Sequence, residues 1–204
     1  MHRPVSYSNL GQKSTPQRLV VGISGASGVI LGIRLLETLK SSTIETHLVL
    51  SETAASIILD ETSFTADDVL SLASIAHDIH DVGACIASGS YATLGMVIIP
   101  CSIKTLSAVA NSYTADLLSR AADVTLKEGR PLVLVVRETP YHPGHLRLMS
   151  EAAAAGAVIF PPVPAFYLRP GSVDEIINNT VGRILARLGI ANNLYQEWQG
   201  QSTG

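Results

Sequence analysis

Arg18-Leu-Val-Val-Gly-Ile-Ser-Gly-Ala-Ser-Gly28 is an apolar run that ends in a cluster of small and polar residues. Such a run is typical of a buried strand, and the small residues after it predict a turn into a helix. The same succession occurs three more times, where apolar runs end at Ser51-Glu52, Ser102-Ile-Lys-Thr105 and Arg137-Glu138-Thr139. In a parallel sheet the carboxyl ends of all strands lie at one edge, where ligands bind. The sequence therefore predicts that these polar residues gather at one ligand site.

Helical patterns alternate with the apolar runs. Apolar residues recur at helical spacing over 27–40, 114–127 and 172–188, and shorter helices are predicted over 54–60, 102–110 and 144–155. Thr65 is predicted as the N-cap of one more helix, with Asp68 three residues on. A last core strand is predicted over 157–160, and a short edge strand within 75–87. This alternation predicts a three-layer α/β/α sandwich around a Rossmann-like or flavodoxin-like parallel sheet.

Length and composition indicate one domain that associates with copies of itself. The 204 residues suit a single domain over 18–204. Residues 1–17 are polar, lack the apolar core of a secretory signal and are predicted to form a flexible leader. Charged residues make up 15% of the chain, against roughly 25% in a typical soluble domain. A chain so poor in charge predicts a homo-oligomer.

Charge and patterning argue against several classes of protein. The net charge of −3, without a basic run, gives no support for binding nucleic acid. Two uncharged stretches, 82–103 and 152–168, are interrupted by glycine and proline, so neither is predicted to span a membrane. The two cysteines, Cys85 and Cys101, fit a reducing compartment, and a cytoplasmic location is expected.

The stretch Gly22-Ile-Ser-Gly-Ala-Ser-Gly28 predicts a phosphate cradle. Small residues let the backbone approach a phosphate, and the free N–H groups at a helix start favour an anion. The spacing is not that of the G-x-G-x-x-G dinucleotide motif, and Ser51 ends the second strand where that motif requires an acid. A serine there suits the ribityl or phosphate oxygens of a mononucleotide. A tight turn that serves packing alone is the alternative.

Two further clusters follow the third and fourth apolar runs. Ser102-Ile-Lys-Thr105 places two hydroxyls and an ammonium group at a helix start, which favours an anion. An ordinary N-cap beside a solvated lysine is the alternative. Arg137-Glu138 emerges where the sheet ends, and a carboxylate held in a crevice can act as a general acid or base. A structural ion pair is the alternative.

A proline-rich loop and two histidine pairs complete the candidate features. The loop 161–170 carries Tyr167 toward the same edge, with a stiffened subunit contact as the alternative. Arg183 lies on the next helix, where a solvated basic face is the alternative. The pairs His77-Asp-Ile-His80 and His142-Pro-Gly-His145 lack a carboxylate or cysteine set at ligand spacing, so no metal site is predicted.

Five stretches, taken in order, form a specific signature: Gly22-Ile-Ser-Gly-Ala-Ser-Gly28, Pro100-Cys-Ser-Ile-Lys-Thr-Leu-Ser107, Arg120-Ala-Ala-Asp-Val-Thr-Leu-Lys127, Pro131-Leu-Val-Leu-Val-Val-Arg-Glu-Thr-Pro140 and Pro161-Pro-Val-Pro-Ala-Phe-Tyr167. From Arg18 to Gly200 the chain resembles the UbiX-type flavin prenyltransferases, long described as aromatic-acid carboxy-lyases. The resemblance implies a flavoprotein domain that joins the dimethylallyl group of dimethylallyl monophosphate to reduced FMN. It also implies a dodecamer and a partner decarboxylase that receives the prenylated FMN, as in ubiquinone synthesis.

The resemblance implies three sets of site residues. The FMN-binding positions are Gly25, Ala26, Ser27, Ser51, Ser102, Ile103, Lys104, Thr105, Arg120 and Arg137. The donor positions are Tyr167, Arg183 and Lys127 at the phosphate, with Ser88, Gly89, Ser90 and Trp198 near the prenyl pocket. The acidic positions are Glu61 and Glu138. Gly129 departs from the family pattern, in which arginine often follows Lys-Glu, and this puts an auxiliary basic contact in doubt.

These residues suggest a mechanism without a metal. Lys127, Arg183 and the Tyr167 hydroxyl would stabilise the phosphate as it leaves. Glu138, or the phosphate itself, would take the proton lost on ring closure, with Ser27 in the relay. The proton-transfer roles of Glu61 and Glu138, and the choice between monophosphate and diphosphate donors, stay open.

Two rival functions stay open beside this one. A flavin-dependent decarboxylase of the related cysteine-decarboxylase group would share the scaffold, but its histidine and Asn-rich substrate motif are not found here. A non-catalytic FMN carrier would bind FMN tightly and form no covalent adduct.

Overall fold

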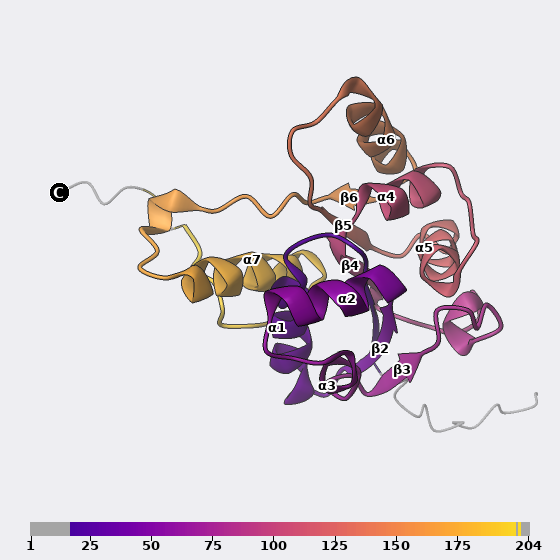
Figure 1. Ribbon diagram of the computed structural model, residues 1–204, viewed down its shortest axis with the longest axis horizontal. Helices are drawn as coiled ribbons and strands as arrows, with labels where there is room; N and C mark the ends of the chain where they lie inside the picture. The colour runs from indigo at the N-terminus through magenta and orange to yellow at the C-terminus, as the bar shows by residue number, and fades with distance from the viewer. Residues whose placement is uncertain (1–16, 199, 201–204) are drawn as a thin grey trace, which may run out of the picture.

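Six parallel strands form one sheet in the computed structural model, which describes residues 17–198 and 200 (Figure 1). The strands are β1 (Arg18–Ile23), β2 (Glu45–Leu50), β3 (Ile75–His77), β4 (Gly95–Cys101), β5 (Leu132–Val136) and β6 (Val158–Ile159). Their order is β3-β2-β1-β4-β5-β6. This is the order of dinucleotide-binding sheets and not the flavodoxin order. The chain adds strands outward in one direction from β1 and in the opposite direction from β4, so the strand order reverses between these two neighbours.

Helices cover both faces of the sheet and complete the predicted three layers (Figure 1). One face carries α1 (Val29–Lys40), α2 (Glu52–Glu61), α3 (Ala66–Leu70) and α7 (Val173–Arg187). The other carries α4 (Ile103–Ala110), α5 (Leu117–Lys127), α6 (Pro143–Ala154) and the short 3₁₀ helix η1 (Cys85–Ala87). A second 3₁₀ helix, η2 (Phe166–Leu168), lies in the segment between β6 and α7. The predicted α/β/α sandwich is confirmed.

Because helices cover both faces of the sheet, the central strands are continuous apolar runs in the sequence. In β1, Leu19 and Val21 belong to the core beneath α1 and α7, whereas Val20 belongs to the core beneath α4 and α5. All seven residues of β4 are buried. The alternation changes near the end of β4, where the register with β5 shifts between Ile98 and Cys101. Cys101 is buried in β4, and this burial raises the pKa of its thiol far above its ordinary value.

Capping residues begin several helices as the sequence predicts. The Thr65 hydroxyl accepts a hydrogen bond from the Asp68 amide, and the Asp68 carboxylate accepts one from the Thr65 amide. Hydrogen bonds from the Thr65 hydroxyl and amide hold the pKa of Asp68 below its ordinary value. The Ser172 hydroxyl caps α7 by accepting a hydrogen bond from the Glu175 amide.

Several ranges differ from the prediction, among them β6, α5 and α1. The last strand, β6, is shorter than predicted and lies at the sheet edge with both residues half-buried, so its prediction as a core strand was wrong. The helix predicted from 114 begins at Leu117, because Asp116 is its N-cap. The helix predicted from 27 begins at Val29, because Gly28 has a left-handed φ of 94°. The edge strand expected within 75–87 is confirmed as β3.

Two predictions concern the chain as a whole, namely a leader at its start and the lack of a membrane-spanning segment. Of the leader predicted over 1–17, only residue 17 belongs to the described residues, so this domain boundary stays a prediction. Within 17–198, no helix combines the length and the apolar character that crossing a membrane requires.

Candidate functional site

A cleft of about 410 Å³ opens at the carboxyl edge of the sheet, where β1 and β4 are neighbours. Residues from the ends of β1, β2, β4 and β5 line it, as the switch-point rule for open α/β sheets predicts. The structure therefore brings together seven of the candidate residues: Gly25, Ser51, Ser102, Ile103, Lys104, Thr105 and Glu138.

Ser24 joins the two central loops of the cleft. Its side chain is buried, and its hydroxyl donates a hydrogen bond of 3.0 Å to the Pro100 carbonyl. The same oxygen accepts a hydrogen bond of 2.8 Å from the amide of Ser102. Because both donor and acceptor capacities are used, the loop after β1 is held against the start of α4.

The predicted hydroxyls at the helix starts are N-caps. The Ser51 hydroxyl accepts a hydrogen bond from the Ala54 amide at 3.2 Å, and the Ser102 hydroxyl accepts one from the Thr105 amide at 3.3 Å. The hydroxyls of Ser102 and Thr105 also lie 3.1 Å apart. That contact uses one of their two protons, so one hydroxyl proton remains for a ligand. Capping and ligand binding are therefore compatible at these positions.

The cleft suits a mononucleotide in size and donor chemistry. Its volume lies in the range of small-molecule sites, about 300–1,000 Å³. A Cβ atom on Gly25 would lie 2.7 Å from Cβ of Thr53, so a larger residue would not leave this loop in place. The amino ends of α2 and α4 begin beside the cleft, and the exposed Lys104 adds a positive charge. Amide groups at helix starts and an ammonium group are the donors that a phosphate requires.

Glu138 connects the main cleft with a second cleft of about 330 Å³. Arg137, Tyr141 and the segment Pro161–Pro164 line the second cleft. The Glu138 carboxylate accepts a hydrogen bond of 2.9 Å from the Thr139 amide, which leaves its other oxygen available for a substrate proton. The exposed Arg137 side chain thus lies beside the main cleft and not among its lining residues.

Ala26, Ser27 and Glu61 are near the cleft but do not line it. Ala26 is buried and Ser27 half-buried within the loop after β1. The Glu61 carboxylate accepts hydrogen bonds from the amides of Gly28, at 2.8 Å, and Val29, at 3.4 Å. Glycine has no side chain to cap α1, so Glu61 provides the cap from the end of α2. This capping contact is the role that the structure gives Glu61.

A second group of candidate residues surrounds α5. Lys127 Nζ lies 2.5 Å from Glu128 Oε1, and this ion pair packs against the backbone of Gly89. The hydrogen bond from Lys127 holds the pKa of Glu128 below its ordinary value. Arg120 donates a hydrogen bond of 3.3 Å to the Ala87 carbonyl. The loop that contains Ser88, Gly89 and Ser90 is thereby joined to Lys127 and Arg120.

Lys127 lies at the opposite end of the sheet from the cleft. Asp116 caps the start of α5 and lines the cleft, whereas Lys127 ends this helix of 11 residues just before β5 begins. At about 1.5 Å per residue, the helix separates the two positions by roughly 16 Å. Lys127 and the cleft therefore do not form one site within a single chain.

A third group lies on the segment that leaves β6. Figure 1 shows this segment, in orange, extending away from the sheet toward η2. The Tyr167 and Trp198 rings contact edge to face with centroids 5.5 Å apart, and both are exposed. Arg183 lies over the Phe160 ring at 5.9 Å, in a cleft of about 220 Å³ that includes Pro161 and Val163.

Six residues that line the main cleft are not among the positions that the family resemblance implies: Glu52, Thr53, Ile79, His80, Asp116 and Leu118. Ser24, which holds the two central loops of the cleft together, is not among those positions either. Ser24 and Glu52 stand directly in the polar clusters after β1 and β2, so those clusters already contained the signal. Ile79 and His80 come from a loop without a motif, and only the folded chain places them there.

Comparisons of the sequence and of the structure with known proteins point to the same family. Residues 7–167 match the family described as Flavoprotein. The chain is similar to the flavin prenyltransferase UbiX of Escherichia coli (strain K12), with 59% identity over 187 residues, which cover 90% of this chain and 99% of that protein.

Two solved structures have the same fold at substantial identity. One is AnUbiX (PadA1) in complex with FMN and dimethylallyl pyrophosphate, with a TM-score of 0.89 and 46% identity over 91% of this chain and 99% of that one. The other is a dodecameric FMN-dependent UbiX-like decarboxylase from Escherichia coli O157:H7, with a TM-score of 0.88 and 45% identity over 90% and 100%.

Proposed function

This chain belongs to the UbiX-type flavin prenyltransferases of the Flavoprotein family, and on that premise we propose that it joins a dimethylallyl group to reduced FMN at the cleft between β1 and β4. The observation that carries the proposal is the grouping of seven expected residues around one cleft at the switch point. Reduced FMN supplies the electron-rich ring that receives the allyl group. Gly25, Ser51 and the residues Ser102–Thr105 would hold it.

The donor phosphate leaves when the allylic carbon–oxygen bond breaks, so its growing negative charge needs stabilisation. Lys127, Arg183 and the Tyr167 hydroxyl are the candidate groups. In one chain, Lys127 lies near the amino ends of the strands, and Arg183 lies in the cleft beside Phe160 and Pro161, which follow β6. We therefore propose that neighbouring copies complete the donor site, in the dodecamer that the family implies. The solved UbiX-like dodecamer supports this assembly.

The carboxylate of Glu138 is the candidate for proton transfer. It lines the main cleft and the adjoining one, and only one of its oxygens is held by the backbone. Ring closure onto the flavin releases a proton, which an oxygen of Glu138 would accept, with Ser27 in the relay. Glu61 would affect the reaction indirectly, because its carboxylate accepts hydrogen bonds from the amides of Gly28 and Val29 and so positions the loop after β1.

The product, prenylated FMN, would serve a partner decarboxylase. Because the donor in the AnUbiX complex is dimethylallyl pyrophosphate, both the monophosphate and the diphosphate are candidate donors for this chain. A cytoplasmic location is proposed as well, supported by the likeness to a bacterial enzyme and by the free thiols of Cys85 and Cys101.

The decisive experiment is anaerobic incubation of the protein with reduced FMN and either dimethylallyl monophosphate or dimethylallyl diphosphate. The flavin is then extracted and weighed by mass spectrometry. A flavin heavier by one isoprenyl unit is the expected product, and the donor that yields it identifies the preferred phosphate.

Two other outcomes would contradict the proposal. Unmodified FMN that co-purifies tightly would indicate a flavin carrier. Unmodified FMN together with release of carbon dioxide from an added carboxylic acid would indicate a decarboxylase, the activity named for the solved UbiX-like dodecamer. Boiled protein controls for non-enzymatic addition.

A further inference from the structure

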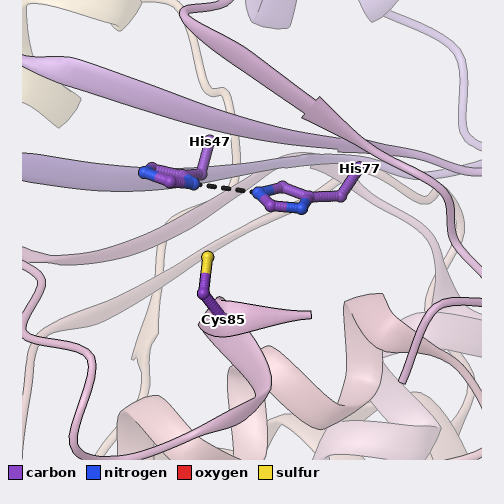
Figure 2. Close-up of side chains that lie close together, drawn as sticks. All are labelled: His47, His77 and Cys85. Atoms are coloured by element: carbon purple, nitrogen blue, oxygen red, sulfur yellow. Dashed lines mark hydrogen bonds between the residues drawn. The ribbon is translucent and has the colours of Figure 1, made fainter. Parts of the chain in front are cut away.

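Two histidines and a cysteine converge at the β3 edge of the sheet, outside the main cleft (Figure 2). His47 comes from β2, His77 from β3 and Cys85 from η1. His47 Nδ1 lies 2.9 Å from His77 Nε2, and the Cys85 sulfur lies within 4.8 Å of a ring nitrogen of each histidine. Figure 2 shows the thiol pointing toward the gap between the two rings.

We propose that His47, His77 and Cys85 form a binding site for one Zn²⁺ ion per chain. Imidazole nitrogen and thiolate sulfur are both ligands that zinc takes in proteins, with Zn–N distances of about 2.0–2.1 Å and a Zn–S distance of about 2.3 Å. Two nitrogens on one tetrahedral zinc lie about 3.4 Å apart. To bind the ion, the two rings would separate by about half an ångström and turn from their mutual hydrogen bond, and the Cys85 sulfur would move in toward both nitrogens. Water would supply the fourth ligand.

The groups behind His47 orient it as a ligand. Glu45 Oε1 lies 2.9 Å from His47 Nε2, and the same carboxylate oxygen accepts a hydrogen bond of 2.9 Å from Arg18. The Tyr91 hydroxyl lies 3.2 Å from His47 Nε2. A carboxylate that accepts from one ring nitrogen fixes the tautomer and leaves the other nitrogen free for a metal. For His47, that free atom is Nδ1, which faces His77 and Cys85.

The three ligands differ in exposure in a way that gives an ion access. His47 is fully buried, His77 is half-buried and Cys85 is exposed. An ion can therefore enter from the side of Cys85, while the buried ring fixes its depth. Because a thiolate and not a thiol is the ligand, binding would release the Cys85 proton.

A zinc ion here would connect three separate elements, β2, β3 and η1. The strand β3 has three residues and pairs only with β2 at the sheet edge, and η1 follows after a loop. None of the three ligands lines the main cleft, so the ion would act by stabilising this edge of the sheet.

Metal binding to the full-length apoprotein tests the site directly. Zn²⁺ should bind with a stoichiometry of one per chain and raise the melting temperature. Co²⁺ should bind in its place and give a thiolate-to-cobalt charge-transfer absorption. Cys85→Ser should abolish that absorption and weaken zinc binding at least tenfold. Glu45→Gln should weaken zinc binding by about 10- to 100-fold, because it removes the group that orients His47.

His80→Ala is the matched control, because His80 lies in the same segment, is exposed and bonds to Glu52. It should leave zinc affinity unchanged. Cys85 is exposed, so Cys85→Ser should fold even if a histidine variant does not, and circular dichroism checks this.

Three results would overturn the assignment. They are the absence of stoichiometric Zn²⁺ binding, a cobalt spectrum that Cys85→Ser does not change, and binding of Cu⁺ without binding of Zn²⁺. The prenyl-transfer assay is run separately on the same preparations. Its failure would contradict the proposed function without affecting the zinc site.

Discussion

Ser24 and Glu61 show how single side chains position the loops of the cleft. Ser24 bonds to the backbone on both sides of the β4–α4 junction, and Glu61 caps α1 at Gly28, 33 positions earlier in the sequence. The sequence marks both as polar residues near predicted turns. It does not reveal their partners, because those contacts are long-range and follow no periodicity.

Glu138→Gln is expected to bind FMN normally and to form the adduct at least about 100-fold more slowly. The substitution removes the candidate proton acceptor, and a general base typically accelerates a reaction by about 100-fold or more. Single-turnover mass spectrometry of the flavin measures the rate, and fluorescence titration measures FMN affinity. Glu151→Gln is the control, since Glu151 pairs with Arg147 on the exposed face of α6 at 2.7 Å. Unchanged turnover in Glu138→Gln would remove this carboxylate from the mechanism.

Among the elements, the strands were the most predictable. All four central strands end directly before the polar clusters that the sequence marks, because a strand covered on both faces shows as an uninterrupted apolar run. Helix starts were less predictable, since they depend on caps. Asp116 begins α5 three residues later than periodicity suggests, and the cap of α1 comes from another helix. The edge strand β6 lacks full burial and therefore a clear signal.

The contact between α1 and the sheet leads to a stability prediction. A Cβ atom on Gly32 would lie 2.5 Å from the Ile99 carbonyl oxygen and 2.9 Å from the Ile23 side chain. Gly32→Ala should therefore overpack this interface and lower the free energy of unfolding by about 1–3 kcal/mol. Urea denaturation at a fixed protein concentration measures it.

Gly83→Ala is the control for that experiment. Its Cβ atom would have Asp81 Oδ1 as its nearest neighbour, at 3.4 Å, in an exposed loop. A surface change of this kind should alter stability by less than about 0.5 kcal/mol. Equal stability of the two variants would show that α1 does not pack as tightly as described.

At the scale of the whole molecule, the sequence predicted the layers but left the strand order open between two arrangements. The observed order depends on which strands pair across the sheet, and no local pattern encodes that pairing. The candidate site was predictable where residues follow strand ends, because topology alone brings such residues together. The α5 group and the η2 segment lie away from the cleft, so their place in one site was not predictable from geometry.

The distance between Lys127 and the cleft predicts that two inactive variants can complement each other in a mixed assembly. If each phosphate pocket combines Lys127 of one copy with Arg183 of another, two inactive variants can rescue each other. Lys127→Ala and Arg183→Ala are unfolded together and refolded as an equal mixture, so that each assembly draws its copies at random from the two variants. A pocket then receives an intact Lys127 and an intact Arg183 in about one case in four, and the mixture should regain activity to that extent. Each variant refolded alone should remain inactive. Activity that stays absent in the mixture would mean that both residues must come from the same polypeptide.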